Sequence, residues 1–289
     1  MTREIALALG GGGAKGNAHL GVIRALEKAG YEIKAVAGTS AGGMVAAVYA
    51  AGYTPDEIID IFSGVKQDEL YSFGKGPGLL GIEGISKALQ LFIDQETFQD
   101  LQIPCALTAV DVKEMQEVVL KEGNVMEAIQ ATIAIPGIFP PKKWGDYQLV
   151  DGGVVDPVPV EVVRSLAPGL PVVAVPLSSL TTQEIKLLPQ NLFHDPPLLK
   201  PIANMRVAQA FDIFLRSIVI TMHYLTEKRL ELEKPEVIIR PEVGHIGYLE
   251  KVNVPQVAKL GEQAVERMLP ALEKNLRKRF RIKDIFSLS

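Results

Sequence analysis

A serine between two glycines is the first feature of the chain that could carry out chemistry. Residues 38–42 read GTSAG, which matches the pattern G-x-S-x-G with Ser40 at its centre. In this motif a sharp turn between a strand and a helix pushes the hydroxyl outward, and the flanking glycines relieve the crowding. An apolar run precedes Gly38, and small residues follow the motif as far as Gly52. We therefore predict that Ser40 is a nucleophile, and an ordinary glycine-containing turn is the alternative.

A serine nucleophile also needs hydrogen-bond donors for the oxyanion that forms when it attacks a carbonyl. Residues 10–16 read GGGGAKG and lie between a predicted strand and a predicted helix. The free backbone N–H groups of such a loop, beside a helix N-terminus, can face the carbonyl. Two adjacent parallel strands would bring this loop and Ser40 together at their carboxyl ends.

Two nucleotide-binding motifs compete for the same glycine loop. A P-loop requires G-x-x-x-x-G-K-[ST], but Lys15 follows an alanine and Asn17 stands where the metal-binding hydroxyl is expected. A dinucleotide site fits G-x-G-x-x-G at Gly11, Gly13 and Gly16, yet the acidic residue expected at the end of the next strand is missing, because GTSAG stands there. The oxyanion role is therefore favoured.

The base that would accept the serine proton is either a histidine or an aspartate. The four histidines, none of them in a local catalytic motif, are His19, His194, His223 and His245. A hydrolase with a serine, a histidine and an acid also usually places its serine after several strands, whereas Ser40 follows only the second predicted one. These observations turn the search toward an acidic residue.

Asp151 is the favoured base. It lies in LVDGGVVDPVP after a predicted strand, and Gly152 and Gly153 allow the backbone to approach a ligand closely. A surface turn is the alternative for this residue. Asp156, five residues later, is interpreted as a turn or cap residue.

The elements around these motifs predict an α/β fold with a parallel sheet. The first fifty residues read as strand, loop, helix, strand, turn and helix, with strands at 4–9 and 35–38 and a helix whose pattern Gly30 ends. Thr54 is placed to cap a helix that begins at Pro55. Further strands are predicted at 103–112, 172–176 and 235–243, with a strand and turn at 114–123 and an extended segment at 147–153. Helices are predicted at 87–98, 125–135, 202–232 and 254–279. Residues 75–86, 135–141 and 183–202 read as irregular.

Composition limits the function further. With a net charge of −4, broad electrostatic binding to nucleic acid is not supported. The single cysteine, Cys105, can form no internal disulfide or metal cluster, and it is interpreted as a buried apolar residue. No apolar stretch is long enough for a membrane span, and the N-terminus does not resemble a secretory signal. We expect a cytoplasmic protein.

The basic end of the chain allows a peripheral contact with a membrane. The segment KNLRKRFRIK contains six basic residues and an aromatic one: Lys274, Arg277, Lys278, Arg279, Phe280, Arg281 and Lys283. It is interpreted as a solvated tail, with contact to anionic lipid as the alternative.

The glycine loop, the GTSAG turn and the DGG sequence at 151–153 together resemble the patatin-like phospholipase family in order, spacing and flanking residues. The segments HLGVIRALEKAG and IPGIFPP also look like those of its small bacterial members. The resemblance is strong over residues 4–180, the predicted hydrolase core, and weaker in the extension 181–289. The whole chain is expected to be a single domain of this kind.

The resemblance implies a three-layer α/β sandwich and a Ser–Asp dyad that hydrolyses lipid esters without a cofactor or metal. Ser40 would be the nucleophile and Asp151 the general base. Gly12 and Gly13, with Gly11 as a third, would supply the oxyanion N–H groups. The remaining motif positions that the resemblance marks as supporting are Lys15, Gly16, Gly38, Gly42, Gly152 and Gly153.

The expected substrate is a phospholipid or another fatty-acyl ester. Residues 79–85 and the helix after 202 are expected to gate the site or hold the acyl chain. An acyltransferase or a thioesterase would use the same acyl-serine, and a lipid-binding regulatory protein could keep the pocket with little turnover. The sequence contains no signal for the oligomeric state.

Overall fold

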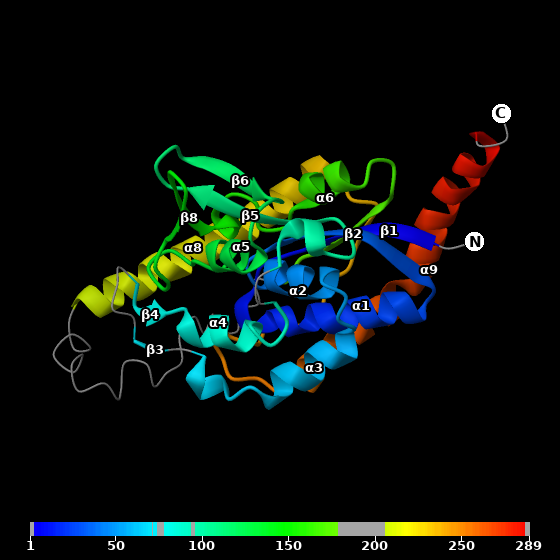
Figure 1. Ribbon diagram of the computed structural model, residues 1–289. Helices are drawn as coiled ribbons and strands as arrows, with labels where there is room; N and C mark the ends of the chain where they lie inside the picture. Colours follow the sequence, from blue (N-terminus) through cyan, green and yellow to red (C-terminus); the bar gives the residue numbers. More distant parts are fainter. Residues whose placement is uncertain (1–2, 71, 74–77, 94–95, 179–205, 287–289) are drawn as a thin grey trace.

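The computed structural model in Figure 1 describes residues 3–70, 72–73, 78–93, 96–178 and 206–286. The predicted irregular segment 183–202 and His194 lie outside the described residues. Along the described chain, an α/β fold places one central sheet between two layers of helices, and this confirms the predicted three-layer sandwich.

Eight described strands form the central sheet. Five are parallel, in the order β10, β9, β1, β2 and β5, and three antiparallel strands extend the β5 edge. The parallel strands are β1 (Arg3–Leu9), β2 (Tyr31–Thr39), β5 (Cys105–Asp111), β9 (Val172–Val175) and β10 (Val237–Ile238). The antiparallel ones are β6 (Gln116–Leu120), β7 (Lys142–Trp144) and β8 (Tyr147–Asp151). The short strands β3 (Ser72–Phe73) and β4 (Leu80–Gly81) pair separately.

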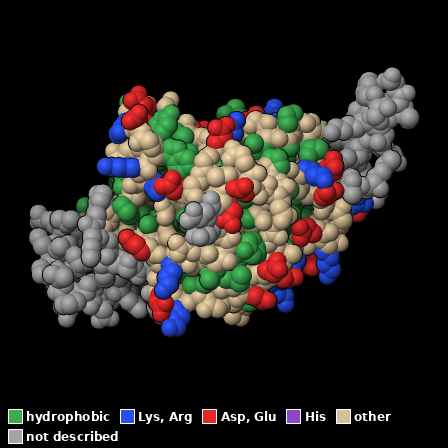
Figure 2. Space-filling view, viewed as in Figure 1, with side chains coloured by type: hydrophobic (Ala, Val, Ile, Leu, Met, Phe, Trp, Pro, Cys, Tyr) green, Lys and Arg blue, Asp and Glu red, His purple; other side chains and the backbone are tan. Residues whose placement is uncertain are grey.

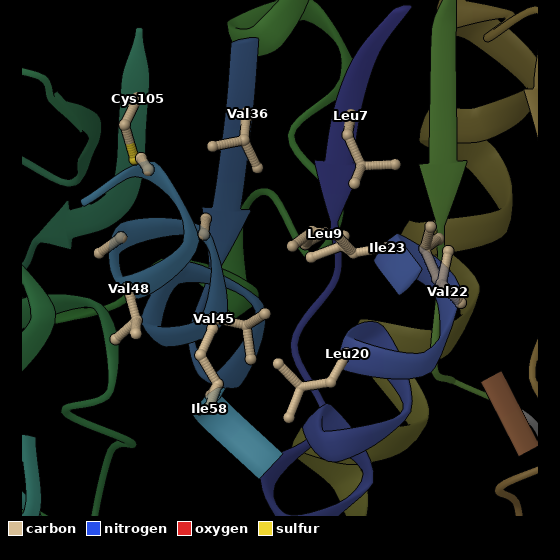
Figure 3. Close-up of a cluster of buried hydrophobic side chains, with 14 of the residues drawn as sticks. Leu7, Leu9, Leu20, Val22, Ile23, Val36, Val45, Val48, Ile58 and Cys105 are labelled. Carbon is tan, nitrogen blue, oxygen red and sulfur yellow. The ribbon is translucent and has the colours of Figure 1, made fainter. Parts of the chain in front are cut away.

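One face of the sheet is covered by the helices that surround the GTSAG turn. These are α1 (Ala18–Lys28), α2 (Ala41–Ala50), α3 (Pro55–Gly64), α4 (Glu83–Leu89), α5 (Val125–Thr132) and α9 (Val254–Phe286). On β1, Leu7 and Leu9 point into this layer, where they join Leu20 and Ile23 of α1 in a fully buried core (Figure 3). Burial of side chains of this size contributes about 1.5–3 kcal/mol each and anchors the loop that follows β1.

The other face is covered by α6 (Val160–Leu166) and α8 (Arg206–Glu233). The alternate residues of β1, Ala6 and Ala8, point toward this side and pack with Val160 and Val163 of α6. Small residues on this face of the strand let the helix lie close to the sheet. On the face of the molecule seen in Figure 2, acidic and basic side chains are interspersed.

The first and last helices cross at very short range. A Cβ atom built on Gly21 of α1 would lie 1.7 Å from the Ala258 carbonyl oxygen, and one on Gly261 of α9 would lie 1.9 Å from the Ala18 carbonyl oxygen. Only glycine at both positions permits this distance between the backbones. The start of α1, directly after the glycine loop, is therefore held by the C-terminal helix.

Several predicted elements are confirmed, and two predictions are wrong. Thr54 caps α3 with a full capping box, and Gly30 follows α1 with a φ of 81°. The helix predicted at 87–98 instead begins at Glu83, and the segment 75–86 predicted to be irregular contains β4 and the start of α4. Residues 74–77 within it lie outside the described residues. The sequence reading also missed α6, which starts directly after Pro159.

At the C-terminus, α9 extends to Phe286, beyond the predicted end at 279. The side chains of the basic segment from Arg277 onward lie outside the described part of the chain. The predicted contact of that segment with anionic lipid stays a prediction.

Candidate active site

Ser40 occupies a strained turn between β2 and α2. Its φ of 55° is positive, which is uncommon for a residue other than glycine. The Ser40 N–H donates to the Thr132 hydroxyl oxygen at 2.9 Å, and the Ser40 carbonyl oxygen accepts the first bond of α2 from Met44 at 3.0 Å. These two hydrogen bonds hold Ser40 in a backbone conformation that is found neither in strands nor in helices. The backbone conformation in turn fixes the direction of the Ser40 hydroxyl.

The glycines on both sides of Ser40 are required by backbone contacts. A Cβ on Gly38 would lie 2.3 Å from the Gly42 carbonyl oxygen, and one on Gly42 would lie 2.3 Å from the Leu9 carbonyl oxygen. The first contact closes the turn on itself. The second brings α2 against the end of β1, where the glycine loop begins.

Asp151 stands at the end of β8 and meets Ser40. The strand β8 pairs antiparallel with β5, and Asp151 lies opposite Ala109. Ser40 and Asp151 line the same cavity, and the Gly153 N–H donates to Asp151 Oδ1 at 2.8 Å. Burial raises the pKa of Asp151 to about 6, while the interactions of the carboxylate with the Ser40 hydroxyl and the Gly153 N–H act in the opposite direction. The structure thus brings together the two residues that the sequence predicted as a dyad.

The glycine loop runs beside Ser40. A Cβ on Gly11 would lie 3.1 Å from the Ser40 Cβ. The Gly11 N–H donates to the Pro157 carbonyl oxygen at 3.1 Å, and this bond argues against the prediction that Gly11 is a third oxyanion donor. Among the described residues, no backbone carbonyl accepts a bond from the N–H of Gly12 or Gly13. Gly13 has a φ of 57°, and Tyr248 lies directly against it.

Lys15 and His19 stabilise the loop and its surroundings without lining a cavity at Ser40. The Lys15 ammonium lies 5.1 Å from the centre of the Tyr248 ring, and burial lowers its pKa. His19 is fully buried, and its Nε2 lies 2.8 Å from the Gly10 carbonyl oxygen. Burial lowers the pKa of His19 to about 4, so the ring is neutral at neutral pH and its Nε2–H donates to Gly10.

The other predicted supporting glycines lie at close contacts around the site. A Cβ on Gly16 would lie 2.7 Å from the Ala41 Cβ, next to the start of α2. One on Gly152 would lie 2.2 Å from the Thr108 hydroxyl oxygen, and one on Gly153 would lie 2.4 Å from the Met222 Cε. Gly153 thus brings α8 close to the aspartate.

Asp156 is a buried ion-pair partner, not the turn or cap residue that the sequence suggested. Its side chain is fully buried, and Oδ1 lies 3.1 Å from Nε of Arg229 on α8. The same Nε lies 2.8 Å from Glu233 Oε1. Burial raises the pKa of Asp156 to about 7, and Arg229 opposes that shift.

Two cavities meet at Ser40. The larger, called here the α4 cavity, has about 940 Å³ of empty space, counting the part that is open to solvent. Its lining includes Ser40, Met44, Phe62, Ile85 and Leu89. The smaller, called the α8 cavity, has about 480 Å³ counted in the same way, and its lining includes Ser40, Asp151, Leu215, Ile218 and Val219. Both are mainly apolar. Of the described histidines, none lines either cavity.

Sequence reasoning missed Thr132 and Tyr248. Thr132 is the last residue of α5, and its hydroxyl oxygen accepts a hydrogen bond from the N–H of Ser40, 92 positions earlier in the sequence. Tyr248 lines the α8 cavity, and its carbonyl oxygen accepts the Ala14 N–H at 2.8 Å. No local pattern marks either residue, because both reach the site through the packing of distant segments.

Comparison with known proteins identifies the family of the chain. The sequence matches the family model described as patatin-like phospholipase over residues 7–164, more than half of the chain. The chain belongs to the patatin-like phospholipase family. The matched residues include the whole glycine loop, Ser40 and Asp151.

Three similar proteins carry NTE names. An uncharacterized NTE family protein of Mycobacterium tuberculosis is 35% identical over 167 residues, which cover 56% of this chain and 46% of that protein. Another from the same organism is 27% identical over 286 residues, 93% of this chain and 47% of that protein. The Lysophospholipase NTE1 of Mycosarcoma maydis is 33% identical over 56% of this chain but 9% of its own length. The chain thus spans less than half the length of these curated relatives.

A solved structure shares the fold. The crystal structure of VipD from Legionella pneumophila matches 93% of this chain and 67% of its own with a TM-score of 0.61, at 15% identity. Within the described residues, no helix combines the length and the hydropathy needed to span a bilayer. No group of three His, Cys, Asp or Glu side chains in the described chain is arranged to hold a metal ion.

Proposed function

We propose that the protein is a serine lipid acyl hydrolase in which Ser40 and Asp151 form a catalytic dyad. The observation that carries the proposal is that the Ser40 hydroxyl interacts with the buried Asp151 carboxylate in the lining of one apolar cavity, next to a second apolar cavity that Ser40 also lines. An ionised carboxylate in this position can accept the serine proton directly, and no histidine is needed between them.

In the proposed first step, Ser40 Oγ attacks the ester carbonyl carbon while Asp151 takes the hydroxyl proton. The oxyanion would be held by the N–H groups of Gly12 and Gly13, which lie beside Ser40 and are free of backbone acceptors within the described chain. The ester C–O bond then breaks, and Asp151 returns the proton to the leaving alcohol oxygen. The product of this step is an acyl-serine.

In the second step, water attacks the acyl carbon and gives a proton to Asp151. The bond between carbon and Oγ breaks, the fatty acid leaves, and the proton returns to Ser40. A pKa of about 6 leaves Asp151 ionised at neutral pH while it remains a better proton acceptor than an ordinary aspartate.

The substrate class follows from the apolar cavities and from the family. Phospholipids and other fatty-acyl esters present the apolar chains that such cavities bury well. The name of the fungal relative, a lysophospholipase, fits the same ester chemistry. We place the reaction at a lipid surface or on dispersed lipid, with the protein binding such a surface peripherally.

The test is hydrolysis of a lipid panel by the wild type, Ser40→Ala and Asp151→Asn, with circular dichroism to confirm folding. Fatty-acid release by the wild type and its loss in both variants would support the dyad. Wild-type release by Ser40→Ala would contradict it.

Two further measurements separate the alternatives. A fluorophosphonate probe should label Ser40, and a folded wild type that takes no label would point to lipid binding without turnover. Addition of an alcohol or thiol acceptor distinguishes hydrolysis from acyl transfer, because a transferase would form the transfer product in preference to free fatty acid.

A further inference from the structure

The two cavities at Ser40 differ in one chemical respect, their contact with Asp151. Ser40 lines both, whereas Asp151 and Gly12 line only the α8 cavity and Gly13 lines only the α4 cavity. Ser40 and the two proposed oxyanion donors thus stand at the border between the cavities. When the carbonyl carbon of an ester is bonded to Ser40 Oγ, the acyl chain would lie in one cavity and the leaving alcohol in the other.

Proton transfer determines which cavity holds the leaving alcohol and which holds the acyl chain. The leaving alcohol oxygen must receive the proton that Asp151 took from Ser40, so it has to lie on the aspartate side of the tetrahedral carbon. That side opens into the α8 cavity. The acyl chain then extends into the α4 cavity, which is the larger of the two and whose lining contains Met44, Phe62 and Leu89.

The leaving-group side is itself apolar. The wall that α8 contributes consists of Leu215, Ile218, Val219 and Met222, and Ile138 faces it from the segment after α5. Asp151 is the only charged side chain among the described residues that line this cavity. An alkyl chain on the leaving alcohol would be buried favourably there, whereas an alcohol whose only large substituent is a charged headgroup would find no ionic partner.

We infer that the preferred substrates are two-chain lipid esters, with the hydrolysed chain in the α4 cavity and the chain retained by the leaving alcohol in the α8 cavity. This inference rests on the proposed function and narrows it. It ranks two-chain lipids above lysophospholipids, although the name of the fungal relative is that of a lysophospholipase.

The test compares dihexanoyl glycerophosphocholine with 1-hexanoyl glycerophosphocholine, both below their critical micelle concentrations. The two share the acyl group and the headgroup and differ only in the second chain. For the wild type, kcat/KM should favour the two-chain lipid by roughly tenfold or more, because each methylene recognised in an apolar pocket contributes to discrimination.

Two variants on the same helix test the location of the second chain. Ile218→Trp fills the α8 cavity and should remove most of the preference for the two-chain lipid. Ile220→Trp is the matched control, since Ile220 is 41% exposed and lines neither cavity, and it should retain the wild-type ratio. Met44→Trp in the α4 cavity should lower kcat/KM for both lipids and keep their ratio. Circular dichroism confirms that each variant is folded.

Two results would overturn the inference, and a third would refute the proposed function on which it rests. A wild-type ratio at or below one removes the preference itself. Loss of the ratio in Met44→Trp with its retention in Ile218→Trp reverses the orientation. A wild type that hydrolyses neither lipid, nor simpler hexanoyl esters, and takes no fluorophosphonate label would instead refute the proposed function, so the two failures are distinguishable.

Discussion

The backbone N–H of Ser40 donates to the side-chain hydroxyl oxygen of Thr132 at 2.9 Å, across 92 positions of sequence. Thr132 is fully buried, and it ends the helix α5 that packs beside the nucleophile turn. This hydrogen bond joins the nucleophile turn to α5. It also gives the backbone N–H of Ser40 an acceptor, because the positive φ of Ser40 takes this N–H out of the hydrogen-bond pattern of strand and helix.

Thr132→Val should destabilise the protein by about 1–3 kcal/mol, because a buried N–H loses its acceptor while the shape is preserved. Urea unfolding measures this change, and the rate of fluorophosphonate labelling at Ser40 should fall with it. Thr132→Ser keeps the hydroxyl and should retain most of both properties. Equal effects of the valine and serine variants would show that packing, and not the hydrogen bond, matters at this position.

The activity should rise with pH, with its midpoint near pH 6, and level off about one pH unit above that. Burial raises the pKa of Asp151 to about 6, and only the ionised carboxylate can accept the Ser40 proton. The profile of kcat/KM for a soluble ester, measured from acidic to mildly alkaline pH, should show one ionisation near that value. A profile that is flat through this range would argue against Asp151 as the base.

The same shift predicts how stability depends on pH. Folding raises the pKa of Asp151 from 3.8 to about 6, so the folded protein binds the proton more tightly than the unfolded chain. This contribution, on the order of 3 kcal/mol, is present at acidic pH and is lost as the pH rises from about 4 to about 6. Asp151→Asn carries no such charge and should be more stable than the wild type at neutral pH.

Urea unfolding of both proteins at neutral and acidic pH checks this prediction. The difference in the free energy of unfolding should shrink as the pH falls from about 6 to about 4, and below that the wild-type carboxyl is protonated in both states. A difference that stays constant across the range would contradict the assignment of the shift to Asp151.

Gly42→Ala should destabilise the fold by about 1–3 kcal/mol or more, because its Cβ would meet the Leu9 carbonyl oxygen at 2.3 Å. Gly64→Ala is a matched control at the end of α3, where a Cβ would meet no atom within 4 Å. That substitution should be neutral or stabilising by up to about 1 kcal/mol. Thermal unfolding of the two variants distinguishes close backbone approach from a general effect of glycine replacement.

Arg229→Met should cost about 3–5 kcal/mol, because it leaves the fully buried Asp156 without its cation. Adding Asp156→Asn to this variant removes the unpaired charge and should recover a large part of the loss. A double-mutant cycle in urea measures the coupling between the two residues. If the two single substitutions change the free energy of unfolding additively, the interaction between Arg229 and Asp156 contributes nothing to stability.

The parts of the site that a short stretch of chain defines were predictable from sequence. Ser40 lies on its turn because a buried strand, glycines and small helical residues follow one another directly. The partners of that turn were not predictable. Thr132 reaches Ser40 through the packing of α5 on α2, and Arg229 reaches Asp156 through the crossing of α8 over the sheet. Such contacts depend on tertiary arrangement, and no local pattern records them.

The wrong boundary of α4 has a physical cause at Gly84. The glycines between 74 and 86 suggested an irregular segment, but a Cβ on Gly84 would lie 2.0 Å from the Glu69 carbonyl oxygen. This glycine serves close packing inside a helix. A glycine that allows a backbone to approach and one that loosens a loop look the same in a single sequence.

The crossing of α1 and α9 determines how far the chain can be truncated without loss of the fold. Residues 7–164, the segment that the family model matches, end before α9 begins at Val254. A protein shortened to that segment would lack the helix packed against Gly21 and would leave the apolar side of α1 in water. The stretch that the family model matches is therefore smaller than the stretch that must fold together, and the last helix supports the helix that follows the glycine loop.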